Sequence, residues 1–196
     1  SVVDATANPM PLTEPRVDPI PRDDWSDEVR TLLDPDGAGG AVLNLYATLA
    51  HHPRLFRPRA VQSTYIRTGS TLSDRAREIL ILRIGWLCGS EYEWSQHVRV
   101  ARRVGMDDAD IRRIAIGADA DGWDPLGQLL VRSVDELHAD DSLSDATWTL
   151  LSEHYSVSEL IDAVITVAGY RMVSIALNSI GTQLEPGRPR FPDVRR

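Results

Sequence analysis

Apolar residues recur at intervals of three or four along most of this chain, and residues that start or end helices separate these stretches. The helical segments that this pattern predicts are 26–33, 42–50, 54–68, 73–88, 90–104, 108–116, 125–139, 144–154 and 156–180. Gly69 is expected to end the third of them in the left-handed conformation. No convincing strand-like alternation and no short solenoid repeat accompany them. The pattern therefore predicts an all-α protein with about eight helices.

The segment 73–88 is apolar on nearly every side, which places it at the centre of the predicted fold. Prolines, in contrast, are concentrated toward both ends of the chain, where they remove backbone donors and disfavour helix. We therefore expect an extended arm at 1–24, a single helical domain at 25–182 and a tail at 183–196.

The composition narrows the class of protein. With 196 residues, of which 42% are apolar and 26% charged, the chain is long enough for one domain with a sizeable core. No apolar stretch is expected to reach the ~18 to 20 residues of a membrane span, so we expect a soluble cytoplasmic protein with no membrane partner. The net charge of −8 argues against nucleic acid as an obligatory partner.

The counts of cysteine and lysine exclude several kinds of chemistry. Cys88 is the single cysteine, which rules out an intrachain disulfide, a CxxC redox pair and a cysteine-rich zinc site. All 21 basic residues are arginine, so no lysine side chain is available for a Schiff base with a substrate carbonyl. His51 and His52 are adjacent and point apart on a helix, so we expect no metal site.

Two ionisable residues lie on the apolar face of the predicted helix 90–104. This face is formed by Glu93, His97, Val100, Ala101 and Val104. A carboxylate and an imidazole four residues apart can touch on a helix, and a buried carboxylate is unfavourable unless it is paired. The pair is therefore a candidate for proton transfer near neutral pH.

Purely structural roles are the alternative for Glu93 and for another carboxylate, Glu78. Ser90 and Glu93 have the S-x-x-E spacing of a capping box, in which Glu93 only satisfies the first amide of its helix. Glu78 lies in the first turn of the predicted helix 73–88, where the helix dipole favours a carboxylate and Arg75 is a possible ion-pair partner.

The run "LSDRAREILILRIGWLCGSEYEWSQHVRVARRVGMDDADI" resembles the carboxymuconolactone decarboxylase family, which also contains thiol-dependent alkylhydroperoxidases. The segment "EYEWSQH" carries the most specific part of the likeness, and weaker likeness in "NLYATLAHHPRLF" and "AGYRMVSIALNSIGTQLEPG" extends it over residues 20–187. The resemblance implies an AhpD-like helical bundle that assembles into a homo-oligomer, as a dimer, trimer or hexamer.

The peroxidase branch of that family has a glutamate, eleven residues, a cysteine, two residues, a second cysteine, three residues and a histidine. Here the same spacing gives Glu78, Ser90, Glu93 and His97, so both redox cysteines are missing. A thiol peroxidase needs a thiolate and usually a second sulfur, which leaves a peroxidase using Cys88 as the weakest alternative. Burial of Cys88 as a small apolar residue is its favoured role.

The decarboxylase branch uses no cofactor, and the resemblance implies a carbanion or enolate formed beside a carbonyl. His97 is then the proton donor or base, Glu93 orients and charges it, and Glu78 is a second relay carboxylate. This predicts a lyase or isomerase acting on a small carboxylated or carbonyl compound, in aromatic catabolism or secondary metabolism. The alternative is a non-catalytic oligomeric module that binds a small molecule or a partner.

Further candidates for substrate binding are weaker, because a structural role such as packing is favoured for each of them. They are Tyr46, Cys88, Tyr92, Trp94 and Arg171. The cation of Arg171 suits a substrate carboxylate, with a structural ion pair as the alternative. Capping and packing are the alternatives for Asn44, His51 and His52.

Overall fold

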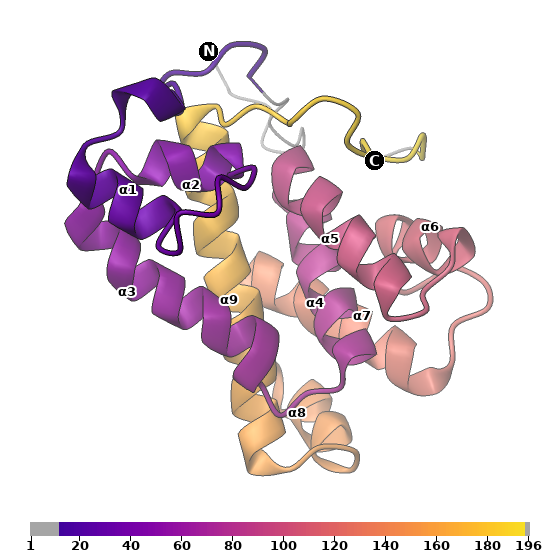
Figure 1. The fold of residues 1–196 in the computed structure, drawn as a ribbon. Helices are drawn as coiled ribbons and strands as arrows, with labels where there is room; N and C mark the ends of the chain where they lie inside the picture. The colour runs from indigo at the N-terminus through magenta and orange to yellow at the C-terminus, as the bar shows by residue number, and fades with distance from the viewer. Residues whose placement is uncertain (1–11, 195–196) are drawn as a thin grey trace, which may run out of the picture.

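The computed structural model describes residues 12–194, and every regular element in that range is helical (Figure 1). Its α-helices are α1 (Asp27–Leu33), α2 (Asn44–Leu49), α3 (Pro53–Thr64), α4 (Asp74–Leu87), α5 (Glu91–Arg103), α6 (Asp108–Ile116), α7 (Pro125–Asp140), α8 (Asp145–Ser152) and α9 (Val157–Ile180). Two short elements accompany them, the 3-10 turn η1 (Arg22–Asp24) and the π-helical turn η2 (Tyr65–Gly69). The all-α prediction is confirmed, and the described range has nine α-helices, one in each of the predicted segments, rather than about eight.

Helix α4 forms the centre of the fold, as its apolar sequence predicts. It starts where Ser73 accepts a hydrogen bond from the backbone N–H of Ala76, and every residue from Ala76 to Trp86 is buried. It packs against α5, α7 and α9, with α6 covering a further side. Burying each large aliphatic side chain of α4 stabilises the fold by about 1.5 to 3 kcal/mol. This rigid centre holds α5 and α9 in fixed positions.

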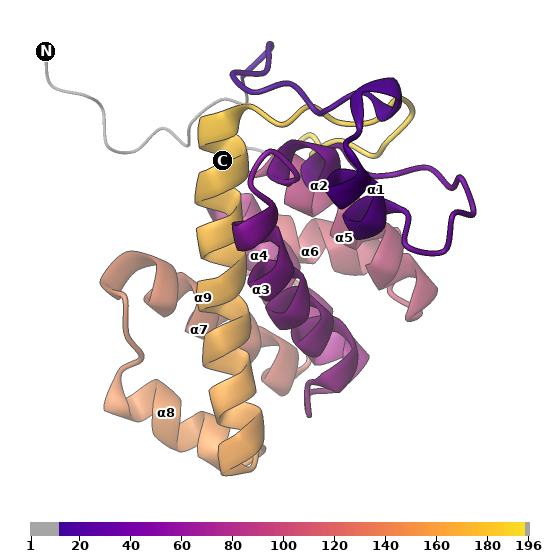
Figure 2. The ribbon, with the colours of Figure 1, turned by 60° about the vertical axis from the view of Figure 1, so that its left-hand side comes forward.

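A layer of α1, α2 and α3 lies over one side of the molecule, drawn in indigo to purple, while α6 and α7 lie on the other side of α4 (Figures 1 and 2). The layer is fastened to α9 through η2, because the Tyr65 hydroxyl and the Thr71 backbone N–H both donate to the carboxylate of Asp162. These bonds fix the distance between α3 and α9.

The end of α3 differs from the prediction. The chain continues from α3 into the π turn η2, and Gly69 is not in the left-handed conformation. Glycine is needed there for a different reason, since a Cβ at Gly69 would lie 2.9 Å from Cδ2 of Tyr65. The π turn directs Ile66 and Arg67 toward the space between α3 and α5, and such turns are frequent at functional sites.

The described part of the N-terminal arm meets the C-terminal tail at the end of α9. The Arg16 backbone N–H donates to the carbonyl of Ile180, and the Gln183 side chain donates to the carbonyl of Leu12. The tail is anchored by Glu185, whose carboxylate accepts hydrogen bonds from other parts of the chain. Its donors are the Tyr92 hydroxyl, the Asn44 backbone N–H and the Gln96 side chain. Residues 1–11 of the predicted arm and 195–196 of the predicted tail lie outside the described residues.

Helix α9 contradicts the expectation that no apolar stretch reaches the length of a membrane span. By length and composition, this helix of 24 residues is long and apolar enough to cross a membrane. Half of its most apolar 18-residue window is buried inside the fold, and the core helix of a soluble protein passes the same test. The expectation that no stretch reaches this length is therefore wrong for α9.

Candidate active site

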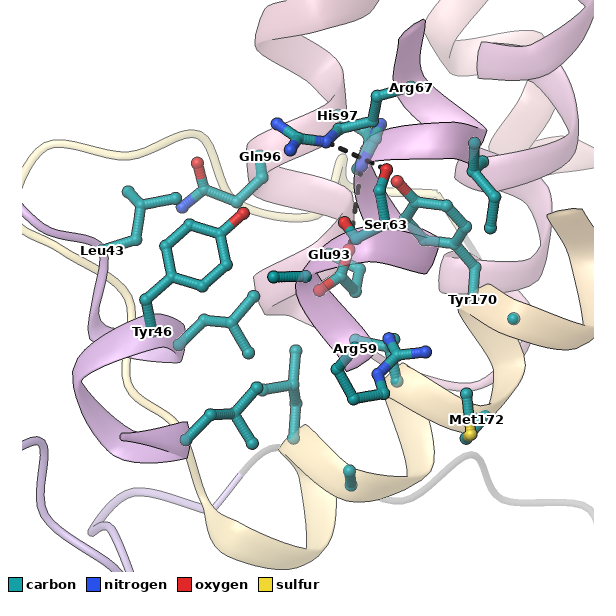
Figure 3. A pocket seen from close by; sticks show the side chains of 18 of the residues that line it. Leu43, Tyr46, Arg59, Ser63, Arg67, Glu93, Gln96, His97, Tyr170 and Met172 are labelled. Atoms are coloured by element: carbon teal, nitrogen blue, oxygen red, sulfur yellow. Dashed lines mark hydrogen bonds and ion pairs between the residues drawn. The ribbon is translucent and has the colours of Figure 1, made fainter. Parts of the chain in front are cut away.

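A cavity of about 490 Å³ lies between α2, α3, η2, α5 and α9 (Figure 3). Its walls are largely apolar and include Leu49, Phe56, Val100, Val173 and Leu177. Glu93, His97 and Val100 line it from α5, whereas Ala101 and Val104 of the predicted face pack in or against the core instead. A volume of this size suits a small organic ligand.

His97 lies between two carboxylates in the wall of this cavity. Its Nδ1 is 2.7 Å from Oε2 of Glu78 on α4, a charge-assisted hydrogen bond in which the imidazole N–H donates. Its Nε2 is 3.8 Å from Oε2 of Glu93, one turn earlier on α5 (Figure 3). Glu78 is only 1% exposed and lies outside the cavity lining, whereas Glu93 and His97 both line the cavity. The structure thus brings the three predicted catalytic residues together.

Burial and charge together set the protonation of this pair. Burial alone lowers the pKa of His97, but the charge and hydrogen bond of Glu78, with the charge of Glu93, outweigh it and raise the pKa above its ordinary value. Burial raises the pKa of Glu93, and the charges of His97 and Arg59 oppose this only in part. Both groups therefore hold a proton more strongly than they do in water, which suits proton donation near neutral pH.

Glu78 is supported from behind by an arginine. The Nε of Arg77 is 3.6 Å from Oε1 of Glu78, and Nη2 of Arg77 donates to Asp74 at 2.7 Å. The expected pairing of Glu78 with Arg75 is wrong, because Arg75 makes two hydrogen bonds to Asp110 instead. The carboxylate of Glu78 is thus held between Arg77 and His97.

The capping-box interpretation of Ser90 and Glu93 is also wrong. Ser90 precedes the first residue of α5, but its side chain makes no capping hydrogen bond. Its hydroxyl is buried without a hydrogen-bond partner among residues 12–194. Glu93 is therefore not occupied at the start of its helix and is available to the cavity.

Tyr170 on α9 is a cavity residue that sequence reasoning did not single out. Its ring meets the imidazole of His97 edge-on, with ring centroids 4.8 Å apart (Figure 3). Burial, followed by the charges of Glu93 and Glu78, raises the pKa of Tyr170. Its hydroxyl is therefore a neutral phenol and a hydrogen-bond donor. The residue stands next to Arg171 in a segment that carries part of the family likeness, which was an available signal.

Of the residues predicted to bind substrate, Tyr46 lines the cavity and four others lie outside its lining in the described structure. Tyr92 donates its hydroxyl to Glu185 at 2.6 Å, and Trp94 packs in the core with its ring 5.4 Å from that of Trp86. Tyr92 and Trp94 therefore have the packing roles that were their alternatives.

Arg171 also has the structural role that was its alternative, an ion pair within the protein. Its guanidinium donates to the carbonyl of Leu137 and to the carboxylate of Asp141, so it is directed away from the cavity. The cavity is instead lined by arginines from α3, η2 and α5, which sequence reasoning missed as ligand-binding residues. They are Arg59, Arg67, Arg99 and Arg103.

The remaining polar candidates of the N-terminal layer have capping and packing roles. Nε2 of His51 donates a hydrogen bond to the carbonyl of Asp18, and His52 caps α3 by accepting a hydrogen bond from the backbone N–H of Leu55. Asn44 donates to the carbonyl of Gln183. Within the described range, no group of three or more His, Cys, Asp or Glu side chains is placed to hold a metal ion.

Alkylation of Cys88 by iodoacetamide should be slow in the folded protein. Burial raises the pKa of Cys88 to about 11, and the charge of Arg171 opposes this only in part. About one thiol in 3,000 is then ionised at pH 7.5, and the thiolate is the reacting form. Mass spectrometry should show alkylation at least tenfold slower than that of the urea-unfolded chain. Cys88 is half-buried, and equal alkylation rates for the folded and the unfolded chain would contradict the effect of this burial on its pKa.

Residues 58–130 match the sequence model of the Carboxymuconolactone decarboxylase family. The matched segment runs from α3 into α7 and contains Glu78, Glu93 and His97, so the predicted resemblance is confirmed. A comparison with curated proteins gave no match.

Three solved structures share the fold at low sequence identity. The alkylhydroperoxidase AhpD core of Ralstonia eutropha JMP134, an uncharacterized peroxidase-related protein, has a TM-score of 0.72 and 19% identity over 87% of this chain and 93% of its own. An uncharacterized peroxidase-related protein of Silicibacter sp. TM1040 has a TM-score of 0.72 and 16% identity over 92% and 94%. A variant of the debrominase Bmp8, in complex with 2,3,4-tribromopyrrole, has a TM-score of 0.69 and 14% identity over 89% and 94%. The AhpD-like fold is therefore confirmed.

Proposed function

We propose that this protein is a cofactor-independent lyase or isomerase, decarboxylase-like in its chemistry. Its substrate is a small carboxylated or carbonyl compound of aromatic catabolism or secondary metabolism. The observation that carries the proposal is the imidazole of His97, held by Glu78 at 2.7 Å and lining an apolar cavity together with Glu93. Such a pair can move a proton to and from a substrate carbon.

We propose roles for the two carboxylates that are the reverse of those expected from the resemblance. Glu78 orients and charges His97 from behind, whereas Glu93 lines the cavity and is placed to exchange a proton with the substrate. Loss of a proton or of carbon dioxide beside a carbonyl leaves an enolate, and protonated His97 is the donor that returns a proton to it. The neutral phenol of Tyr170 supplies a further hydrogen bond for the enolate oxygen.

The alternatives have less support. A non-catalytic binding module predicts that Glu93 and His97 are closed off in a hydrogen-bonded cluster, but both line the 490 Å³ cavity. A peroxidase using Cys88 needs an accessible thiolate, but burial raises the pKa of this thiol to about 11.

Hydrogen exchange in D₂O tests the proposal across several classes of substrate at once. The protein is incubated with 2-oxo acids, 3-oxo acids and carboxylated enol lactones, and ¹H NMR follows loss of carbon-bound protons and of carboxylate. We expect at least one class to exchange or decarboxylate faster than without protein. Background rates for every class, at protein concentrations that give folded spectra, overturn the proposed function.

We also propose that the protein is a homo-oligomer that pairs through α9. Large apolar side chains are exposed along one stripe of this helix, at spacings of three, four and seven residues. They are Val157, Ile161, Ile165, Met172 and Ile175. The spacing suits a second helix packed along it, and the same stripe of another copy provides an equally apolar partner in a two-fold arrangement. A cytoplasmic location, and the absence of nucleic-acid and membrane partners, belong to the same proposal.

Replacing Ile165 and Ile175 by glutamate should dissociate this oligomer. Charges placed on both sides of a two-fold helix pair repel and lose their hydration on pairing. Light scattering coupled to size exclusion is expected to give a multiple of 21.8 kDa for the wild type and a monomer for the double variant. A monomeric wild type, or one that partitions into lipid vesicles instead, contradicts pairing through α9.

A further inference from the structure

The charge around the cavity is opposite in sign to that of the whole chain. The chain has a net charge of −8, but four arginines and a single carboxylate, Glu93, line the cavity. The arginines are Arg59 on α3, Arg67 on η2, and Arg99 and Arg103 on α5. A group of like charges around a largely apolar cavity attracts ligands of the opposite sign.

Two of these cations lie next to the candidate catalytic residues. Figure 3 shows Arg67 near His97, and Arg59 on the other side of Glu93 toward Met172. The charge of Arg67 opposes the rise in the pKa of His97 and Tyr170, and the charge of Arg59 opposes the rise in the pKa of Glu93, so the cations lie close to these groups. An anion bound by these arginines therefore lies at the same end of the cavity as the proton-transfer groups.

Neither guanidinium is neutralised by an ion pair within residues 12–194. Arg59 donates to the side-chain oxygen of Gln62, and Arg67 donates through Nε to the carbonyl of Ser63 at 3.2 Å. Arg59 is half-buried and Arg67 is exposed, so both guanidinium groups can be reached from solvent. Remaining N–H groups of Arg59 and Arg67 are thus available to a ligand, and the fork of a guanidinium matches a carboxylate.

From these observations we propose that the cavity binds an amphipathic carboxylate, with its anionic group on Arg59 and Arg67 and its apolar body against Leu49, Phe56 and Val173. Arg99 and Arg103 add positive charge to the cavity lining. This inference rests on the proposed function, because it takes the cavity beside Glu93 and His97 as the substrate site. In place of Arg171, the cation predicted from the sequence, the site uses Arg59 on α3 and Arg67 on η2.

Calorimetric binding of matched probes tests the inference independently of turnover. The probes are naphthalene-1-acetate, its neutral isostere naphthalene-1-acetamide, and the cation 1-naphthylmethylammonium. We expect the carboxylate to bind at least tenfold more tightly than the amide, with the cation weakest. The affinity for the carboxylate should fall as salt is added, because salt screens the attraction of the arginines.

Variants assign the effect to particular residues. Arg59→Gln combined with Arg67→Gln should weaken binding of the carboxylate at least tenfold and change binding of the amide less than twofold. Arg132→Gln is the control, since this exposed arginine pairs with Asp119 outside the cavity. Equal affinity for carboxylate and amide, no binding by any probe, or carboxylate binding unchanged in the double variant overturns the inference.

The outcomes also separate this inference from the proposed function. If the carboxylate binds in an arginine-dependent way but no substrate exchanges in D₂O, the anion site is supported and the lyase or isomerase activity is contradicted. If exchange in D₂O depends on His97 but not on Arg59 and Arg67, the enzymatic activity is supported and the anion site is contradicted.

Discussion

Replacing His97 by glutamine should slow the exchange or decarboxylation of the best substrate by a factor of about 10² to 10⁴. The imidazole is the group that Glu78 holds by a hydrogen bond and that lines the cavity, so glutamine removes the proton donor but keeps a polar side chain of similar length. Initial rates measured by ¹H NMR in D₂O give the effect, and far-UV circular dichroism checks that the helices are intact.

The matched control for this prediction is His154→Gln. His154 is an exposed histidine at the end of α8, outside the cavity lining, so this variant should keep the wild-type rate. A His97→Gln variant that is folded and retains more than a third of the wild-type rate contradicts a role for His97 in proton transfer.

Replacing Glu78 by glutamine should destabilise the protein most strongly at acidic pH. Breaking a buried pair by removing one partner costs about 3 to 5 kcal/mol. The pKa of His97 is raised in the folded protein, so the stabilisation is fully present below the unfolded value of 6.5 and is lost as pH rises through the folded value. Urea unfolding between pH 5 and pH 9 should therefore show the difference between wild type and variant shrinking with pH.

Taking this difference cancels the contributions of groups that the variant leaves alone, such as Asp110, whose pKa is lowered to about 2 by Arg75. Asp119→Asn is the control, since this carboxylate is 96% exposed and should change stability by less than about 0.5 kcal/mol. A difference between wild type and Glu78→Gln that grows with pH contradicts the raised pKa of His97.

Much of the fold could be predicted because local and global signals agree. The apolar run in 73–88 leaves α4 no polar side to turn toward water, so its central position follows from the sequence alone. The four-residue spacing of Glu93 and His97 fixes them on one face of α5 whatever surrounds it. These two inferences are sufficient to locate one wall of the cavity.

Contacts between helices explain what could not be predicted. Glu78 meets His97 because α4 and α5 pack against each other, and the sequence separation of 19 residues says nothing about that crossing. Arg59 and Arg67 line the cavity because the π turn and the Asp162 bonds orient α3 and η2 toward α9. Arg171 looked like a ligand for anions, but its partner Asp141 lies 30 residues away in the chain.

The central claim is that Glu78 and Glu93 together raise the pKa of His97 in the wall of the cavity, and the titration of His97 tests this most directly. With ¹⁵N-labelled histidine, long-range ¹H–¹⁵N spectra report the proton on each ring nitrogen between pH 5 and pH 9. We predict a midpoint above the ordinary value of 6.5, with both His97 nitrogens protonated below that midpoint, and a lower midpoint in Glu78→Gln. A wild-type midpoint at or below 6.5, unchanged in the variant, would contradict the account.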